Sequence, residues 1–146
     1  MKSPDQLTEV FRHHGLKVTP QRLAVFAALH GDCTHPTADV VHRAVVAELP
    51  TVSLRTVYAV LTELADLGEI QSIDVGTGAT RFDPNVNGHH HLVCDGCGAV
   101  FDVGVDHTNV SPVGSTEGFS IRSTEVVFRG RCGPCRVRNQ SQTESS

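Results

Sequence analysis

The chain lacks any run of about 18 apolar residues, which is the length that a membrane-spanning helix requires. Residues 1–5 also lack the apolar stretch with which a secretory signal peptide continues. We therefore expect neither a membrane segment nor export, and the sequence predicts a cytoplasmic protein without a membrane partner.

Basic residues are scarce as well. The chain has 12 Lys and Arg against 16 Asp and Glu, a formal net charge of −4 at pH 7. Residues 1–80 contain six Lys and Arg and nine Asp and Glu, a balance of −3. The N-terminal part is therefore not basic either. Because neutralising phosphates needs local Lys and Arg, composition argues mildly against a nucleic-acid partner. Any DNA binding must come from a small basic patch.

Cysteine is frequent by comparison, with five residues. In a chain that is not exported, this favours metal or redox chemistry over a disulfide scaffold. Two Cys-x-x-Cys pairs are formed by Cys94, Cys97, Cys132 and Cys135. Four thiolates in a tetrahedron select zinc and leave no open coordination position, so we predict a structural Zn²⁺ site. Two local disulfides and reversible zinc release are the alternatives. Cys33 has no partner in this count, and we expect it to be a small buried residue.

The tetrapeptide Cys132-Gly133-Pro134-Cys135 also matches the thioredoxin active site. That chemistry needs the pair at a strand-to-helix junction of a βαβ fold, where the helix N-terminus lowers the pKa of the first thiol. Too little chain follows Cys135 to complete such a fold. We therefore expect no enzyme and no small organic substrate, and a thiol-disulfide oxidoreductase is kept as an alternative class.

The N-terminal part reads as four short helices, each preceded by a residue whose hydroxyl can cap it. These capping residues are Ser3, Thr19, Thr37 and Ser53. Two short strands with a turn between them, over residues 69–74 and 79–83, follow the helices. This order is typical of a winged helix-turn-helix, in which the fourth helix would lie in a DNA major groove. A helical bundle with a hairpin fits the same pattern, and both readings stay open here.

The fourth helix, over residues 54–67, has two different faces. The apolar face carries Leu54, Val57, Leu61 and Leu64. The other face shows Arg55, Thr56, Tyr58, Ala59 and Thr62. Residues 83–88, rich in Pro, Gly and Asn, then read as a hinge. Beyond it we expect strands around Val93, Val100–Val103, residues 119–121 and residues 126–128, a loop over 108–118, and a polar, disordered tail from Asn139.

The histidines beside the first cysteine pair suggest a second metal. His89 and His91 alternate, so on a strand they point to one face, and His90 points to the other. Two imidazoles need further ligands, and the candidates are His35, Asp83 and Asp102. Such a mixed nitrogen and oxygen set suits Fe²⁺ or Mn²⁺, while zinc and nickel stay open. Taken singly, a residue such as His35 or Asp83 is usually a polar surface residue or a cap.

Four motifs then decide between the readings. They are Leu16-Lys17-Val18-Thr19-Pro20-Gln21-Arg22, His35-Pro36-Thr37-Ala38-Asp39, Val52-Ser53-Leu54-Arg55-Thr56-Val57-Tyr58, and His89-His90-His91-Leu92-Val93-Cys94-Asp95-Gly96-Cys97-Gly98. In this order and spacing the chain resembles the ferric uptake regulator (Fur) family, from about residue 5 to Cys135. The resemblance implies a homodimeric, metal-dependent transcriptional repressor that binds a double-stranded DNA operator with an inverted repeat.

The resemblance implies an α+β fold in three parts: a winged-helix DNA-binding domain over residues 1–83, a metal-binding α/β dimerisation domain over 84–138, and the tail over 139–146. By position, the regulatory metal ligands are His35, Asp83, His89, His91 and Asp102. Asp83 is typical of the peroxide-sensing branch, since the iron-sensing branch usually has Glu there. In the peroxide-sensing branch bound Fe²⁺ reacts with hydrogen peroxide, and a ligand, here His35 or His89, becomes 2-oxo-histidine.

By the same resemblance the targets include antioxidant genes such as a catalase. An iron-, zinc- or nickel-responsive repressor of the same family is the nearest alternative, and a metal-storage module is a further class. The matched DNA-contacting positions are Lys17, Arg22, Arg55, Thr56 and Tyr58. Arg pairs with guanine edges and a Tyr ring packs against thymine methyls. Arg22 fits a buried ion pair equally well, and Tyr58 fits a partly buried core position.

Three features depart from the family pattern. His90 and Ser123 occupy places where members often have ligands of another metal site, so we expect no such site here. Ala59 stands where members commonly have Arg or Asn, which removes one DNA contact. The segment after Asp106 is richer in Gly, Ser and Pro than the usual helix.

Overall fold

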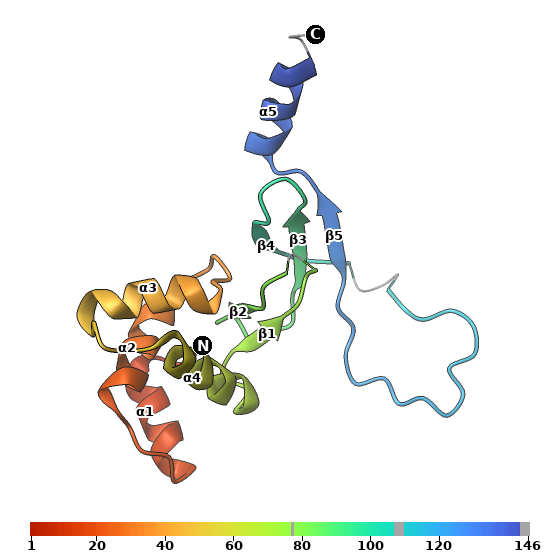
Figure 1. Ribbon diagram of the computed structural model, residues 1–146. Helices are drawn as coiled ribbons and strands as arrows, with labels where there is room; N and C mark the ends of the chain where they lie inside the picture. Colours follow the sequence, from red (N-terminus) through yellow and green to blue (C-terminus); the bar gives the residue numbers. More distant parts are fainter. Residues whose placement is uncertain (77, 107–109, 144–146) are drawn as a thin grey trace. The chain divides into compact units, whose positions relative to one another are not determined.

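The computed structural model of the chain describes residues 1–76, 78–106 and 110–143, the last five of these by their backbone alone. The chain forms two compact units, Met1–Asn87 and Gly88–Ser146 (Figure 1). The first unit is built mainly from helices and the second around a three-stranded sheet. Within the described ranges, no helix has both the length and the apolar character that crossing a membrane requires.

Four helices open the first unit: α1 (Pro4–His13), α2 (Pro20–Leu29), α3 (Ala38–Glu48) and α4 (Leu54–Asp66). Each begins after the predicted Ser or Thr, whose hydroxyl accepts a hydrogen bond from the backbone N–H three residues later. These bonds satisfy N–H groups that have no partner inside the helix. The four predicted caps are thereby confirmed.

The four helices share one hydrophobic core. Its fully buried side chains include Leu7, Phe11, Phe26, Leu61 and Leu64. The rings of Phe11 and Phe26 meet edge to face, with centroids 5.0 Å apart. Such pairs prefer this geometry because the positive ring edge faces the negative ring face.

The hairpin is shorter than predicted. Strand β1 (Gln71–Ile73) pairs antiparallel with β2 (Arg81–Asp83). The buried ring of Phe82 joins the helical core from β2, and its N–H donates to the carbonyl of Pro36 over 2.9 Å. Four helices followed by a small hairpin are the elements that both readings predicted, the winged helix and the helical bundle with a hairpin. Leu54 departs from prediction, because this first residue of α4 is exposed while Val57 and Leu61 are buried.

The second unit is a mixed sheet in the order β4–β3–β5, followed by one helix. Strand β3 (His90–Cys94) pairs antiparallel with β4 (Val100–Val103) and parallel with β5 (Val127–Gly130). Helix α5 (Gly133–Thr143) begins directly after Cys132, the first cysteine of the second pair. One Cys-x-x-Cys thus lies in the β3–β4 turn and the other where β5 passes into α5.

Two expectations for this unit are wrong. No strand forms over residues 119–121, where Phe119 and Ile121 are exposed and pair with no strand among the described residues; the strand expected at 126–128 is present as β5 and begins at Val127. The polar segment from Asn139 is not irregular, because α5 continues to Thr143. Pro134 sits in the first turn of α5, where its missing N–H costs nothing, and the Arg and Gln residues that follow favour helix. The predicted loop is confirmed over 110–118; residues 108 and 109 lie outside the described residues.

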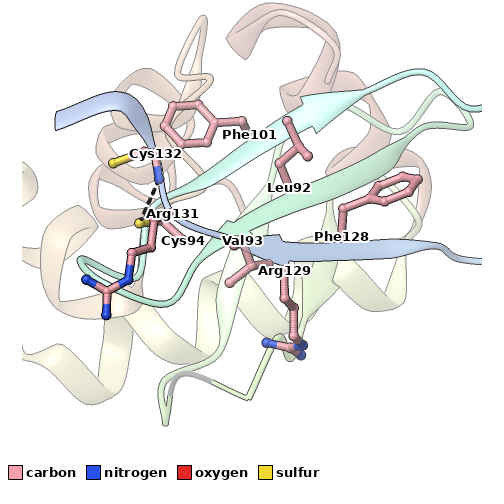
Figure 2. A pocket seen from close by; sticks show the side chains of 9 residues that line it. Leu92, Val93, Cys94, Phe101, Phe128, Arg129, Arg131 and Cys132 are labelled. Carbon is pink, nitrogen blue, oxygen red and sulfur yellow. Dashed lines mark hydrogen bonds between the residues drawn. The ribbon is translucent and has the colours of Figure 1, made fainter. Parts of the chain in front are cut away.

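One face of this sheet carries an exposed apolar row. Leu92 is paired in register with Phe101 on one side and Phe128 on the other, and each is exposed by 41–48%. Figure 2 shows the three side chains lining one shallow pocket, with Val93 and Arg129 on the opposite side of their strands. We call Leu92, Phe101 and Phe128 the apolar row.

Candidate metal centres and nucleic-acid interface

The two cysteine pairs come together in the second unit. One sulfur from each of Cys94, Cys97, Cys132 and Cys135 lies within 4.8 Å of all the others. The sulfurs of Cys97 and Cys132 are 3.8 Å apart. Two thiolates bound to one zinc ion at about 2.3 Å with tetrahedral angles are separated by roughly this distance. The donor set and its spacing therefore fit a structural Zn²⁺ ion.

Backbone N–H groups stabilise the thiolate form of Cys94, which is the form that binds a cation. The N–H of Cys132 donates to the sulfur of Cys94 over 3.2 Å. This bond, with N–H groups of Cys97 and Gly96, lowers the pKa of Cys94 from 9.0 to about 6, because each stabilises the thiolate. Gly96 also has a steric role, since a Cβ there would lie 2.9 Å from the sulfur of Cys135. A larger residue at this turn would push a ligand out of place.

The arrangement of the four cysteines bears on the disulfide and thiol-enzyme readings. All four are free thiols facing one another, so the local-disulfide reading has no support. The tetrapeptide starting at Cys132 does stand at a strand-to-helix junction, as thioredoxin chemistry requires. A hydrogen bond from the backbone N–H of Cys135 lowers the pKa of Cys132. The side chain of Cys94 and burial raise this pKa by more, so the pKa of Cys132 lies above its ordinary value. A raised pKa is the opposite of an activated nucleophile. Cys33 is exposed in the loop between α2 and α3, so the expectation of a buried residue is wrong.

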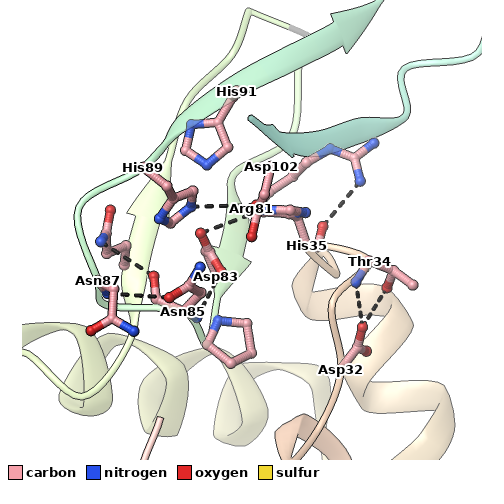
Figure 3. A network of polar contacts seen from close by, with 12 residues as sticks. Asp32, Thr34, His35, Arg81, Asp83, Asn85, Asn87, His89, His91 and Asp102 are labelled. Atoms are coloured by element: carbon pink, nitrogen blue, oxygen red, sulfur yellow. Dashed lines mark hydrogen bonds and ion pairs between the residues drawn. The ribbon is translucent and has the colours of Figure 1, made fainter. Parts of the chain in front are cut away.

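His35 and Asp83 form a buried pair in the first unit. His35 Nε2 lies 3.5 Å from Asp83 Oδ2, and both side chains are at most 2% exposed (Figure 3). His35 has a φ of 54°, in the left-handed region that non-glycine residues rarely adopt. Its carbonyl accepts a hydrogen bond from Arg81, and the Asp83 carboxylate accepts one from the N–H of Asn85. A buried, strained pair held from both sides is characteristic of a functional site rather than of a surface cap.

This pair is connected to α4 through neighbouring residues. Pro36 follows His35 and accepts the N–H of Phe82, which precedes Asp83. The ring of Phe82 meets the ring of Tyr58 edge to face, with centroids 6.1 Å apart. The backbone segments that carry His35 and Asp83 are therefore linked through Phe82 to Tyr58 on α4.

His89, His91 and Asp102 form a second cluster, in the second unit. Each offers one ligand atom within 4.8 Å of the others'. His89 Nε2 lies 3.3 Å from Asp102 Oδ1, and the rings of His89 and His91 are 4.7 Å apart. Figure 3 shows Asp102 on β4 facing the two histidines, as the antiparallel register of His91 with Asp102 requires. Two imidazoles and a carboxylate are ligands suited to Fe²⁺ or Mn²⁺.

The neighbouring residues have different roles. His90 is buried and its Nδ1 accepts the N–H of Val126 over 3.0 Å, so this histidine ties β3 to the segment before β5. Sequence reasoning missed Glu125, whose Oε1 lies 3.1 Å from Nδ1 of His91. No motif surrounds Glu125, and only the parallel pairing of β3 with β5 brings it to the histidines.

The residues proposed for DNA contact gather beside α4. Lys17, Arg22, Arg55 and Thr56 line one hollow between the α1–α2 connection and α4. Arg55 also lines a neighbouring hollow with Tyr58, which is 48% exposed. Tyr58 is thus half open to solvent while its ring edge rests on Phe82.

Arg22 is engaged within the unit. Its guanidinium binds Glu63 of α4 through contacts of 2.7, 2.9 and 3.1 Å, and it also donates to the carbonyl of Lys17. The guanidinium carbon lies 5.2 Å from the ring centroid of Phe11, a cation–π distance. These contacts correspond to the ion-pair interpretation of Arg22, which the sequence analysis left open beside a DNA contact.

A protein-family model matches most of the chain. The model of the ferric uptake regulator family matches residues 13–129. The chain belongs to the ferric uptake regulator family. Its helices, hairpin, three-stranded sheet and cysteine site agree with this membership, and the predicted α+β fold is confirmed. As a Fur-family member it is related to transcriptional regulators.

Three relatives illustrate the match. The chain is 36% identical over 91 residues to the peroxide-responsive repressor PerR of Staphylococcus aureus, covering 62% of each chain. It therefore spans less than two thirds of the length of that relative. The structure resembles PerR from Streptococcus pyogenes, described for peroxide sensing and gene regulation, at 25% identity and TM-score 0.53, covering 92% of this chain and 94% of that one. It also resembles the ferric uptake regulator of Pseudomonas aeruginosa with manganese, at 25% identity and TM-score 0.61, with 86% and 97% coverage.

The donor sets together fit the predicted cofactors. Four thiolates provide a closed site for Zn²⁺. Imidazole and carboxylate groups, present in each unit, provide ligands for Fe²⁺ or Mn²⁺.

Proposed function

We propose that this Fur-family chain is a cytoplasmic, homodimeric repressor that binds operator DNA when its regulatory site holds Fe²⁺ or Mn²⁺, and that hydrogen peroxide releases the iron form. The buried His35–Asp83 pair carries this proposal. Its strained backbone, its burial and its link to α4 together suit a signal-receiving metal site. The likeness to two PerR proteins supports peroxide as the signal.

One ion would be held by ligands from both units. His35 and Asp83 supply one nitrogen and one carboxylate, while His89, His91 and Asp102 supply two nitrogens and another carboxylate. Within each unit, polar atoms of these side chains lie close together, 3.5 Å apart for His35 and Asp83 and 3.3 Å apart for His89 and Asp102. Binding one ion through both sets would restrict the hinge and favour one arrangement of the units.

The Phe82–Tyr58 contact would pass this restraint to the DNA-reading helix. Asp83 and Phe82 are consecutive on β2, so fixing the carboxylate on a metal also fixes the ring beside it. Tyr58 packs on that ring from α4. Metal binding would thereby order the side chain that we assign to thymine methyl contact.

Peroxide would act on the iron form through the ligands themselves. Bound Fe²⁺ would supply the electron that reduces hydrogen peroxide. His35 or His89, as ligands of that ion, would be oxidised at the imidazole carbon between the two ring nitrogens, and peroxide would provide the added oxygen and the oxidising equivalents for 2-oxo-histidine. The altered ring would be a poorer ligand, so the site would lose its ion and the hinge its restraint. Mn²⁺ does not readily supply this electron, so the manganese form would stay bound to DNA.

The DNA interface would be the α4 side of the first unit. Lys17, Arg55 and Thr56 line one hollow, and Tyr58 opens on the next. Lys17 would contact a phosphate or the minor groove, and Arg55 a guanine edge. Dimer symmetry would supply a second copy of this small patch, which compensates for the net charge of −4.

The apolar row would lie in the dimer interface. Leu92, Phe101 and Phe128 form a contiguous exposed strip across three strands, and a strip of this kind marks an interaction surface. Because the segment after Asp106 forms neither helix nor strand through Val126 among the described residues, it supplies no regular element to cover the strip. A second copy presenting the same residues would bury it.

A metal-supply repressor is the second candidate. The likeness to the manganese-bound Fur of P. aeruginosa is closer in TM-score than the likeness to S. pyogenes PerR. In this reading the same site would report the concentration of metal, and peroxide would have no effect at low concentration.

The test starts from a duplex selected from random DNA by the zinc- and Mn²⁺-loaded protein. Fluorescence anisotropy then measures binding of that duplex by the Mn²⁺ and Fe²⁺ forms, with and without low peroxide, under anaerobic loading. We expect both forms to bind and only the iron form to release DNA after peroxide. Release of neither form would favour the metal-supply repressor, and binding that ignores metal altogether would reject a metal-dependent repressor.

A further inference from the structure

Glu125 makes a contact that neither the metal-binding motifs nor the proposed function uses. Its Oε1 lies 3.1 Å from Nδ1 of His91. The two residues are 34 positions apart in sequence, and the His91 ring is 1% exposed while the Glu125 side chain is half exposed. One end of the contact is therefore fixed in the interior and the other reaches it from the surface.

Backbone bonds hold Glu125 in place. The N–H of His91 donates to the carbonyl of Val126 over 3.1 Å, and the N–H of Val126 donates to Nδ1 of His90. His91 is then in register with Val127 at the start of β5. The residue that follows Glu125 is thus bonded on both sides to the histidine run, which limits where the carboxylate can go.

A carboxylate at this place has a definite chemical effect on the imidazole. It accepts a hydrogen bond from the Nδ1–H group, so the neutral ring keeps its hydrogen on Nδ1 and presents the Nε2 lone pair. The negative charge also favours binding of a cation at Nε2. His89 lies on the same face as His91, with ring centroids 4.7 Å apart, and Asp102 lies opposite His91 on the neighbouring strand β4.

We propose that Glu125 is a positioning residue of the regulatory metal site: it fixes the tautomer and orientation of His91 so that Nε2 binds the Fe²⁺ or Mn²⁺ ion. This inference rests on the proposed function, because it assumes that His91 is a ligand. Glu125 itself does not bind the metal; it acts through His91.

The first experiment measures Mn²⁺ binding to the zinc-loaded protein by titration calorimetry. Glu125→Ala should lower the affinity by about 10–100-fold, the usual effect of losing a partner of a ligating histidine. Glu125→Gln keeps an oxygen acceptor and should recover most of the affinity. Glu117→Ala, an exposed glutamate of the same segment, is the matched control and should bind Mn²⁺ as the unaltered protein does. Zinc content and thermal unfolding should be equal in all four proteins.

The second experiment reads the His91 tautomer without any regulatory metal. Long-range proton–nitrogen correlation spectra of nitrogen-15 histidine-labelled, zinc-loaded protein should show the Nδ1–H form for His91, and a mixture of tautomers in Glu125→Ala. A residue with only a stability role would not change this spectrum.

The outcomes separate this inference from the proposed function. If the unaltered protein fails to bind Mn²⁺, the regulatory site is rejected whatever Glu125 does. If the unaltered protein binds Mn²⁺ and Glu125→Ala binds it equally well, the positioning role is rejected and the site stands. An Nε2–H tautomer of His91 in the unaltered protein would also overturn the role of Glu125.

Discussion

Replacing Arg22 by glutamine distinguishes a structural cation from a DNA contact. The Arg22–Glu63 pair joins α2 to α4 with three contacts of 2.7–3.1 Å, and the two side chains are 16% and 35% exposed. Hydrogen bonds between charged groups contribute about 1.5–3 kcal/mol, and the exposure of Glu63 reduces this through solvent screening. The cation–π contact with Phe11 adds about 0.5–1 kcal/mol. We expect Arg22→Gln to lower the free energy of unfolding by about 2 kcal/mol.

Urea unfolding of the zinc-loaded protein, followed by circular dichroism, measures this loss. The double-mutant cycle with Glu63→Gln should give a coupling energy of about 1 kcal/mol, because about half of the loss comes from the ion pair and the rest from the contacts of Arg22 with Phe11 and Lys17. The salt dependence of operator binding supplies the second readout. Lys17→Gln should reduce the slope of log affinity against log salt by about 1, as expected for one phosphate contact, and Arg22→Gln should leave it unchanged.

The reasoning about Arg22 would be refuted by the reverse pattern. Additive stabilities in the cycle, together with a slope that falls in Arg22→Gln as it does in Lys17→Gln, would make Arg22 a phosphate contact. The pair with Glu63 would then be an arrangement of the DNA-free protein alone.

Three further changes test other parts of the molecule. Cys135→Ser should abolish stoichiometric zinc binding, as measured by a metal-sensitive dye, because a tetrahedral site loses one of four ligands. In the zinc-free protein the lowered pKa of Cys94 stabilises the fold fully above the ordinary value of 9.0, and this stabilisation should fade as pH falls through about 6; equal unfolding at pH 5 and 8 would contradict it. Asp83→Glu should keep metal-dependent DNA binding but blunt release by peroxide, and equal sensitivity of the variant would remove the reason for assigning Asp83 to a peroxide sensor. Phe101→Lys should shift the protein toward monomer in sedimentation while Val113→Lys, at a fully open position, should not; a monomer–dimer balance unchanged by Phe101→Lys would remove the apolar row from the interface.

The features that sequence predicted well are those set by local chemistry. The hydroxyls of Ser3 and Ser53 cap helices because the N–H groups they satisfy lie three residues away. The two cysteine pairs identify their metal from ligand type and spacing alone. Neither inference depends on how distant segments pack.

The features that sequence missed depend on distant pairing. Glu125 reaches His91 only through the parallel β3–β5 ladder, which no local pattern announces. Residues such as Phe119 look strand-forming in isolation, yet they have no partner strand among the described residues, so they stay irregular. Leu54 fits the apolar period of α4 but falls on the first residue of the helix, beyond the edge of the core.

Locating the oxygen added by peroxide tests the central claim most directly. The zinc-loaded protein is prepared with Fe²⁺ or with Mn²⁺, treated with low peroxide, digested, and sequenced by tandem mass spectrometry, with His90 as the internal control. The account predicts that the iron form alone gains one oxygen atom, on His35 or His89, in proportion to the fraction of DNA released. An iron form that releases DNA without modified histidine, or that stays bound and unmodified, would contradict it.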